Sequence, residues 1–231
     1  MPVICGRYDF PPSACFDEID AAIRQMTDRV VAFNAHMFPA PKGAIIFNTE
    51  NLEQVPDWRE RWAGHELWDM GARNCEITGA KYVPIGYHPS MERFTRGPAL
   101  DIDVVFCGSI NERRAKIIDG MTARGLRVQV VGPNSAYGRE RDEILARAKL
   151  ALNMMFYPDG MFPALRVAHL VANRIPVLSE RCPGGWDIVP TCEYSGLVDA
   201  AVRWIRDDEV LSICANDALK AFRERAMVLP S

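Results

Sequence analysis

Short apolar runs alternate with amphipathic stretches along most of the chain, a pattern typical of α/β proteins. The strand-like runs fall at residues 3–5, 29–33, 44–47, 81–84, 103–107, 126–131, 151–156 and 176–179. The stretches with helical spacing fall at residues 16–26, 58–68, 109–124, 139–148, 163–173 and 198–227. In the last of these, Val202, Ile205, Val210 and Ile213 are expected on the apolar side. The alternation predicts parallel strands joined by right-handed helical crossovers.

The clearest single unit begins at residue 103. The strand 103–107 ends at Gly108, and Ser109 with Glu112 has the S-x-x-E spacing of a capping box, which predicts a helix capped by Ser109. Gly125 supplies a left-handed stop for that helix, and the next strand follows at once. Strand, helix and strand together predict a βαβ unit. A later helix is expected to carry Pro163 at its first position.

Composition narrows the class of protein. The 231 residues are 48% hydrophobic and 25% charged, with a net charge of −3, which excludes disordered and fibrous classes and a basic footprint over the whole protein. No apolar run approaches the roughly 20 residues of a membrane span, and MPVICGRYDF does not resemble a signal peptide. Seven scattered cysteines and four dispersed histidines predict neither disulfides nor a metal site. A cytoplasmic protein is therefore expected.

Arg113 and Arg114 form the first candidate site. They lie in the first turn of a helix that follows a parallel strand, where the helix dipole disfavours cations and backbone amides attract anions. Two arginines fit there if an external anion, such as a diphosphate, compensates them. The alternative is that they pair with nearby acids or point to water. These residues alone leave both interpretations open.

The strand-to-helix loop 157–163 is the second candidate site. It contains Asp159, Gly160, Met161 and Phe162, and it leads into Arg166 and His169, which are three residues apart and share a helix face. Glycine allows a ligand to approach the backbone closely. Alternatively, Arg166 pairs with Asp159 or Glu180 inside the fold, and His169 is a core histidine. The chain has no G-x-G-x-x-G, P-loop, G-x-S-x-G or H-E-x-x-H motif.

Together these segments resemble the GT-B glycosyltransferases. DVVFCGSINERRAKIIDGMTARGLRVQVVG and RDEILARAKLALNMMFYPDGMFPALRVAHLVANRIPVLSE look like the nucleotide-binding domain of that family. IIFNTENLEQVP and YVPIGYHPSMER are similar to its acceptor-side domain and interdomain loop. The resemblance implies an α/β fold of two Rossmann-like lobes with parallel sheets. Residues 1–98 would be a reduced acceptor-side lobe, and residues 99–231 the nucleotide-sugar-binding lobe with C-terminal helices.

The same resemblance implies transfer of a sugar from a nucleoside-diphosphate sugar to an acceptor hydroxyl, without a metal or another cofactor. Gly108 and Ser109 would face the diphosphate, and Arg113 or Arg114 would neutralise it. The donor-binding residues from the second site would be Asp159, Gly160, Met161, Phe162, Arg166 and His169. One departure stands out: related sequences place a glutamate just before this arginine to hold the ribose, and here Pro163-Ala164-Leu165 precedes Arg166.

An inverting mechanism needs a base near the acceptor hydroxyl. By analogy with the acceptor domain, His36 is the first candidate and Glu50 the second, with loop hydrogen bonding as the alternative for both. The acceptor classes are a glycan, a small molecule or modified DNA. Two other functions stay open: an inactive nucleotide- or glycan-binding module, and a glycosyltransferase that acts on modified bases of phage DNA. The second would use a basic rim of Lys42, Arg59, Arg61, Arg73, Arg93 and Arg96.

Overall fold

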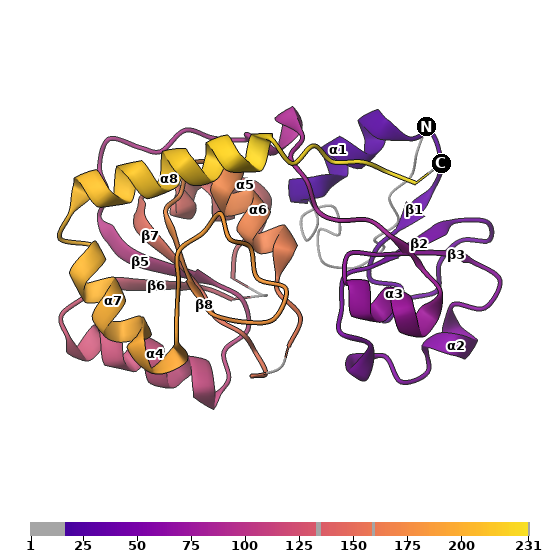
Figure 1. Ribbon diagram of the computed structural model, residues 1–231, viewed down its shortest axis with the longest axis horizontal. Helices are drawn as coiled ribbons and strands as arrows, with labels where there is room; N and C mark the ends of the chain where they lie inside the picture. The colour runs from indigo at the N-terminus through magenta and orange to yellow at the C-terminus, as the bar shows by residue number, and fades with distance from the viewer. Residues whose placement is uncertain (1–16, 133–134, 159, 231) are drawn as a thin grey trace. The chain divides into compact units, whose positions relative to one another are not determined.

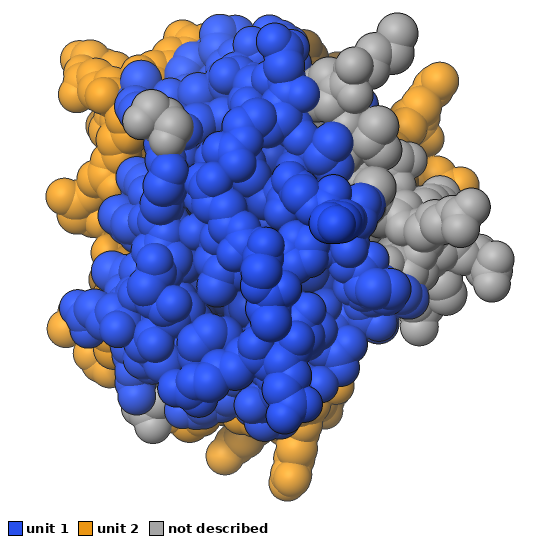
Figure 2. Space-filling model, turned by 90° about the vertical axis from the view of Figure 1, so that its right-hand side faces the viewer, with its two compact units in different colours: residues 1–91, 226–231 blue, residues 92–225 orange. Residues whose placement is uncertain are grey.

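The computed structural model describes residues 17–132, 135–158 and 160–230. The chain divides into two compact units (Figure 2): Met1–Met91 with Ala226–Ser231 (unit 1), and Glu92–Arg225 (unit 2). Each unit has its own all-parallel sheet (Figure 1). These sheets confirm the predicted α/β class with two Rossmann-like lobes. The strand predicted at residues 3–5 lies outside the described residues.

Unit 1 is built on a four-stranded sheet in the order β1-β2-β3-β4. Its strands are β1 (Val31–Ala32), β2 (Ile45–Asn48), β3 (Glu66–Asp69) and β4 (Lys81–Tyr82). Its helices and 3-10 turns are α1 (Asp17–Met26), η2 (Leu52–Gln54), α2 (Trp58–Arg61), α3 (Ala72–Thr78) and η3 (Pro89–Met91). All four residues of β2 are buried, as expected for a central strand covered on both faces.

One helix predicted in unit 1 is wrong. The helical spacing of Trp58, Trp62, His65 and Trp68 predicted a helix to residue 68, but α2 ends at Arg61. Gly64 follows with φ +78°, a left-handed conformation that ends a helix. Trp68 belongs to β3, is 1% exposed, and packs edge-on against the Phe47 ring.

Unit 2 is built on a five-stranded sheet in the order β6-β5-β7-β8-β9. Its strands are β5 (Ile102–Cys107), β6 (Val128–Val131), β7 (Ala148–Asn153), β8 (Val177–Glu180) and β9 (Thr191–Cys192). Its helices are α4 (Glu112–Ala123), α5 (Gly138–Leu145), α6 (Ala164–Ala172), α7 (Leu197–Trp204) and α8 (Asp208–Arg223), with the 3-10 turn η4 (Tyr194–Gly196). The strand order reverses between β5 and β7, and open α/β sheets bind ligands beyond the strand carboxyl ends at such a switch point.

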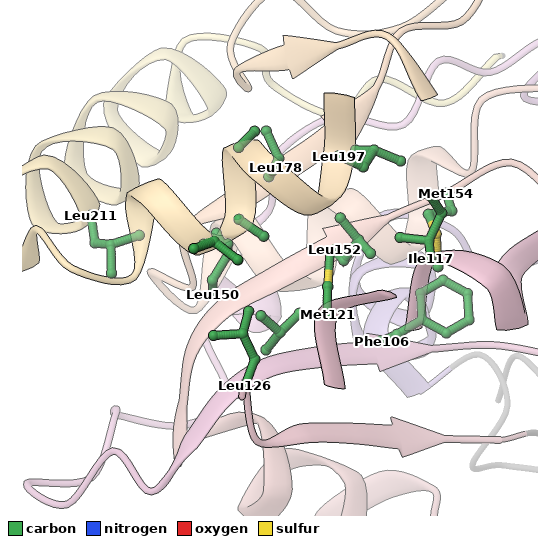
Figure 3. Close-up of a cluster of buried hydrophobic side chains, with 14 residues drawn as sticks. Phe106, Ile117, Met121, Leu126, Leu150, Leu152, Met154, Leu178, Leu197 and Leu211 are labelled. Atoms are coloured by element: carbon green, nitrogen blue, oxygen red, sulfur yellow. The ribbon is translucent and has the colours of Figure 1, made fainter. Parts of the chain in front are cut away.

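The core of unit 2 lies between the sheet and helices α4, α7 and α8 (Figure 3). Phe106 and Leu152 from the strands meet Ile117 from α4 and Leu197 from α7. Val105 points to the opposite face of β5 from Phe106 and is also fully buried. Strand β5 is therefore covered on both faces, which explains why it is a continuous apolar run in the sequence.

The predicted capping of two helices is wrong. Helix α4 begins at Glu112, and its cap is Asn111, whose side chain accepts a hydrogen bond from the Arg114 amide. Ser109 lies two residues outside this cap, so it does not form the predicted capping box. Pro163 is the N-cap residue of α6 rather than its first helical residue.

The single helix predicted at 198–227 is two helices. Asp207 caps α8 by accepting a hydrogen bond from the Val210 amide at 3.0 Å, which starts a new helix in a new register. Val210 and Ile213, expected on the apolar side, are 36% and 51% exposed. Leu211 and Phe222 are buried instead.

Candidate functional site

Gly108 directly follows the carboxyl end of β5 and lies next to the side chain of Arg166. Gly108 has φ +142°. A Cβ at this position would lie 2.9 Å from Nη2 of Arg166 and 3.4 Å from the Phe106 ring. Glycine is therefore required here for both the backbone conformation and the close approach of Arg166. The exposed loop residue Ser109 follows directly.

Arg113 is held by a carboxylate from β8. Its Nη1 donates to Glu180 Oε2 at 2.9 Å and to the Met155 carbonyl at 3.1 Å, and its Nη2 pairs with the other Glu180 oxygen. The guanidinium lies 3.9 Å from the Tyr194 ring centroid. Glu180 also accepts a hydrogen bond from the Met155 amide at 2.9 Å. Arg113 thus makes the pairing with a nearby acid that the sequence left open, and it ties α4 to the end of β8.

Arg114 is directed into the fold and is 4% exposed. It donates to the carbonyls of Ser109, Met154 and Met155 at 2.7, 2.6 and 3.2 Å. Burial, followed by the charges of Arg166 and Arg113, lowers the pKa of Arg114. The carbonyls satisfy its N–H groups but carry no formal charge, so Arg114 adds positive charge at the switch point.

Arg166 lies in the first turn of α6 and is half-buried. Its Nη1 donates to Oδ1 of Asn153 at 3.3 Å, and its guanidinium lies 5.5 Å from the Phe106 ring centroid. Arg114 lies 5.0 Å from the centroid of the same ring. We call Arg113, Arg114 and Arg166 the arginine cluster. Its members contact residues at the carboxyl ends of β5, β7 and β8, next to the switch point.

Asn153 is a residue of this site that the sequence analysis missed. It is fully buried at the end of β7, and its amide nitrogen donates to the Ser179 hydroxyl at 2.9 Å. Its oxygen is thereby directed to Arg166. The sequence predicted a strand at 151–156 with Asn153 inside it, whereas β7 (Ala148–Asn153) ends at this residue. The available signal was that Asn153 is the one polar residue of the predicted run.

We call residues 155–163 the donor loop, after the role that the family resemblance implies for it. Its Asp159 lies outside the described residues, and Met161 is half-buried. A Cβ on Gly160 would lie 3.1 Å from the Tyr157 carbonyl and 3.4 Å from Met155, so the loop itself occupies the space beside this glycine. Phe162 is 5% exposed. Both residues therefore have roles in the folding of the loop, and direct contact with a donor stays a prediction for them.

His169 is a buried residue of α6 that pairs with an aspartate of α5. It is 3% exposed, its Nε2 lies 2.9 Å from Asp142 Oδ1, and its ring lies 5.9 Å from that of Phe94. Asp142 also accepts from Arg93 at 3.0 Å. Arg166, one turn earlier on the same helix, contacts residues of β5 and β7, so the contacts described for the two residues are with different partners. The geometry favours the core-histidine alternative for His169.

The two candidate bases lie in unit 1. His36 is half-buried, and burial followed by the charge of Arg61 lowers its pKa, which keeps the ring neutral at pH 7. Glu50 is half-buried in the loop after β2. Asn48 and Asn74 donate to its carbonyl at 2.8 and 2.9 Å. The role of either residue as a base stays a prediction.

A buried polar network supports the Glu50 loop, and the sequence analysis did not identify it. Asp69, at the end of β3, is 1% exposed and accepts from Asn48 at 2.7 Å, from Asn74 at 3.1 Å and from the Gly71 amide at 2.7 Å. Burial raises the pKa of Asp69 despite these hydrogen bonds. The network fixes the carboxyl ends of β2 and β3.

Within the described residues, no group of three His, Cys, Asp or Glu side chains is placed to hold a metal ion. In the same part of the chain, no helix has the length and apolar character needed to cross a membrane.

No family model matches the chain. It is similar to three uncharacterised proteins of Acanthamoeba polyphaga mimivirus. L138 is 23% identical over 209 residues, which cover 82% of this chain and 24% of that protein. L137 is 23% identical over 81% of this chain and 28% of its own length. L140 is 24% identical over 70% of this chain and 59% of its own length. The chain therefore spans about a quarter of L138 and L137.

Solved structures show the fold. A mutant of S. aureus TarM, in complex with Fondaparinux, alpha-GlcNAc-glycerol and UDP, matches with a TM-score of 0.57 and 9% identity, over 91% of this chain and 55% of that one. WaaG, a glycosyltransferase involved in lipopolysaccharide biosynthesis, matches with a TM-score of 0.55 and 10% identity, over 96% of this chain and 81% of WaaG. The predicted GT-B-like fold is confirmed.

Proposed function

We propose that the chain transfers a sugar from a nucleoside-diphosphate sugar to an acceptor hydroxyl. The observation that carries the proposal is the arginine cluster at the switch point of unit 2. Burial is the main cause that lowers the pKa of Arg114, and the charges of Arg166 and Arg113 lower it further, against the effect of Glu180. A bound anion would relieve the repulsion between these guanidiniums. A diphosphate has the charge and the oxygen acceptors for this role.

Each arginine has a distinct part in the proposed site. Arg166 is half-buried beside Gly108, so we assign it the direct contact with the diphosphate. Arg114 adds positive charge from its buried position, where hydrogen bonds to three backbone carbonyls hold its guanidinium in place. Arg113 with Glu180 holds the donor loop in position. As the sugar–oxygen bond breaks, negative charge develops on the leaving diphosphate, and preorganised cations stabilise it without rearrangement.

The acceptor side of the proposal rests on unit 1. His36 or Glu50 would take the proton of the acceptor hydroxyl in an inverting mechanism. The fold likeness to WaaG and the UDP-bound TarM mutant supports a nucleotide donor for this chain. We propose that a metal is not required, because the arginine cluster supplies the balancing charge.

Binding to nucleoside diphosphates tests the donor site. Calorimetry of the full chain with UDP, GDP, ADP and dTDP should show one that binds, and Arg166→Ala should raise its Kd about 10- to 100-fold, since a hydrogen bond to a charged group contributes roughly 1.5–3 kcal/mol. Arg139→Ala is the matched control, because Arg139 is 91% exposed on α5 and pairs only with Glu143 among the described residues. Equal affinities of the two variants would refute the site.

Turnover distinguishes an enzyme from a binding module. A panel of nucleotide sugars, incubated with EDTA present, should yield free nucleoside diphosphate if the chain is a metal-independent transferase. Binding without turnover would favour the inactive module, which the replacement of the usual glutamate by Leu165 motivates. Of the basic residues proposed for action on DNA, Arg93 pairs with Asp142 and Arg96 donates to the Ala148 carbonyl. This alternative stays a prediction.

A further inference from the structure

The donor loop is contacted at its start by the last residue of β8 and at its end by the β8–β9 connection that follows (residues 181–190). At the start of the loop, the Met155 amide donates to Glu180, the last residue of β8. At its end, the Phe162 ring lies 5.5 Å from the Trp186 ring, with the planes at 49°. The loop that carries the proposed donor contacts therefore takes its position from a neighbouring segment as well as from its own sequence.

Trp186 lies between the donor loop and the end of α8. Its ring stacks on that of Phe222, with centroids 5.3 Å apart and planes at 30°, and Phe222 is fully buried. The Arg225 guanidinium lies 5.8 Å from the Trp186 centroid and pairs with Asp187. We call Phe162, Trp186 and Phe222 the aromatic cluster. Aromatic pairs at these distances each contribute beyond the area that they bury.

The β8–β9 connection is folded tightly against this cluster. The Gly185 amide donates to the Cys182 carbonyl at 3.1 Å. A Cβ on Gly185 would lie 3.1 Å from that carbonyl oxygen and 3.9 Å from the Phe162 ring. A side chain at position 185 would therefore crowd the Cys182 carbonyl, and the turn places Trp186 next to Phe162.

We propose that Trp186 is a positioning residue of the donor site. Through Phe162 it holds the donor loop, and with it the first turn of α6, where Arg166 lies four residues further along the chain. Phe222 fixes Trp186 from the other side, so the end of α8 sets the geometry of the donor loop. This inference rests on the proposed function, because it assigns Trp186 a role in diphosphate binding.

Three full-chain variants test it. Trp186→Ala removes the contact, and Trp186→Phe retains an aromatic ring. Trp204→Ala is the matched control, because Trp204 packs against the core of unit 2 from α7. For each variant without ligand, we would measure the hydrogen-exchange rate of peptides covering the donor loop and the melting temperature. Calorimetry would give the Kd for UDP, or for whichever nucleoside diphosphate the wild type binds.

We expect Trp186→Ala to accelerate exchange in the donor loop and to raise the Kd at least tenfold. Trp186→Phe should restore both, and Trp204→Ala should lower the melting temperature while leaving loop exchange and Kd at wild-type values. Unchanged loop exchange in Trp186→Ala, or faster exchange with unchanged Kd, overturns the proposal. A wild-type chain that binds no diphosphate refutes the proposed function, while the exchange measurement still decides separately whether Trp186 holds the loop.

Discussion

Gly108 leaves room beside the backbone for the Arg166 guanidinium. In Gly108→Ala, the new methyl group would displace the Arg166 guanidinium, because the ideal Cβ position is 2.9 Å from its Nη2. We expect UDP affinity to fall about tenfold, the value of one charge-assisted hydrogen bond, as measured by calorimetry. Gly125→Ala is the control: it has φ +84° but no neighbour within 4 Å, so it should cost roughly 1 kcal/mol of stability without changing affinity.

Asp142 provides a pH-dependent contribution to stability. Burial acts to raise its pKa, but the hydrogen bond from His169 and the charges of His169, Arg141 and Arg93 outweigh burial and lower it. A carboxyl whose pKa is lower in the folded than in the unfolded state stabilises the fold above about pH 4 and loses that effect below it. Asp142→Ala should therefore cost about 3 kcal/mol at pH 7.

Urea unfolding at pH 7 and pH 3 measures this effect. The difference between wild type and Asp142→Ala should be smaller at pH 3. The control Asp199→Ala, at a position 75% exposed, should change the free energy of unfolding by almost nothing at either pH. A difference for Asp142→Ala that does not change with pH would contradict an ionised carboxylate at this position.

At the scale of elements, the N-terminus of α4 has two residues of a type that can cap a helix, Ser109 and Asn111, and only Asn111 is the cap in the structure. Asn111 accepts from the Arg114 amide at 3.0 Å and donates to the Phe156 carbonyl at 2.8 Å. Asn111→Ala should cost about 1–2 kcal/mol, the usual range for an N-cap. Ser109→Ala should stay within about 0.5 kcal/mol. Denaturant unfolding of both variants measures the difference, and equal losses would restore Ser109 as the cap.

Buried parallel strands were the elements that the sequence predicted best. The run at 103–107 coincides with β5 because a strand covered on both faces has no polar alternation to obscure it. The helix predicted through Trp68 was wrong because a period near 3.6 also arises by chance when a short helix and a strand follow each other. The buried face of α8 was predicted wrongly because the spacing of apolar residues does not show whether a helix continues through Asp207 or a new helix begins there.

The site was predictable only in part. The residues alone predicted two separate candidate sites, and only the family resemblance assigned Gly108, Arg113 or Arg114, and Arg166 to one donor site. The sequence did not show which acid pairs with which arginine, since Glu180 is 67 residues from Arg113 and their contact depends on strand order. The same argument applies to His169 and Asp142, which are 27 residues apart.

At the scale of the whole molecule, the boundary of unit 2 can be tested directly. Asn173 is 1% exposed, and its side-chain oxygen accepts from the Arg93 and Phe94 amides at 2.7 and 3.0 Å. A fragment of residues 92–225 should unfold cooperatively in denaturant. A fragment beginning at residue 99, the boundary predicted from the sequence, should be less stable, because it leaves the Asn173 oxygen buried without these donors. Equal stability would contradict the assignment of residues 92–98 to unit 2.

Unit 1 is discontinuous along the chain: Tyr87 forms a parallel bridge with Ala226, and its carbonyl accepts from the Met227 amide at 3.0 Å. A ribosome makes the chain from its N-terminus, so all of unit 2 leaves the exit tunnel before Ala226 can reach Tyr87. The unit that is begun first is completed last. During synthesis, the hydrogen bond between the Tyr87 carbonyl and the Met227 amide can form only after a further 140 residues have been translated.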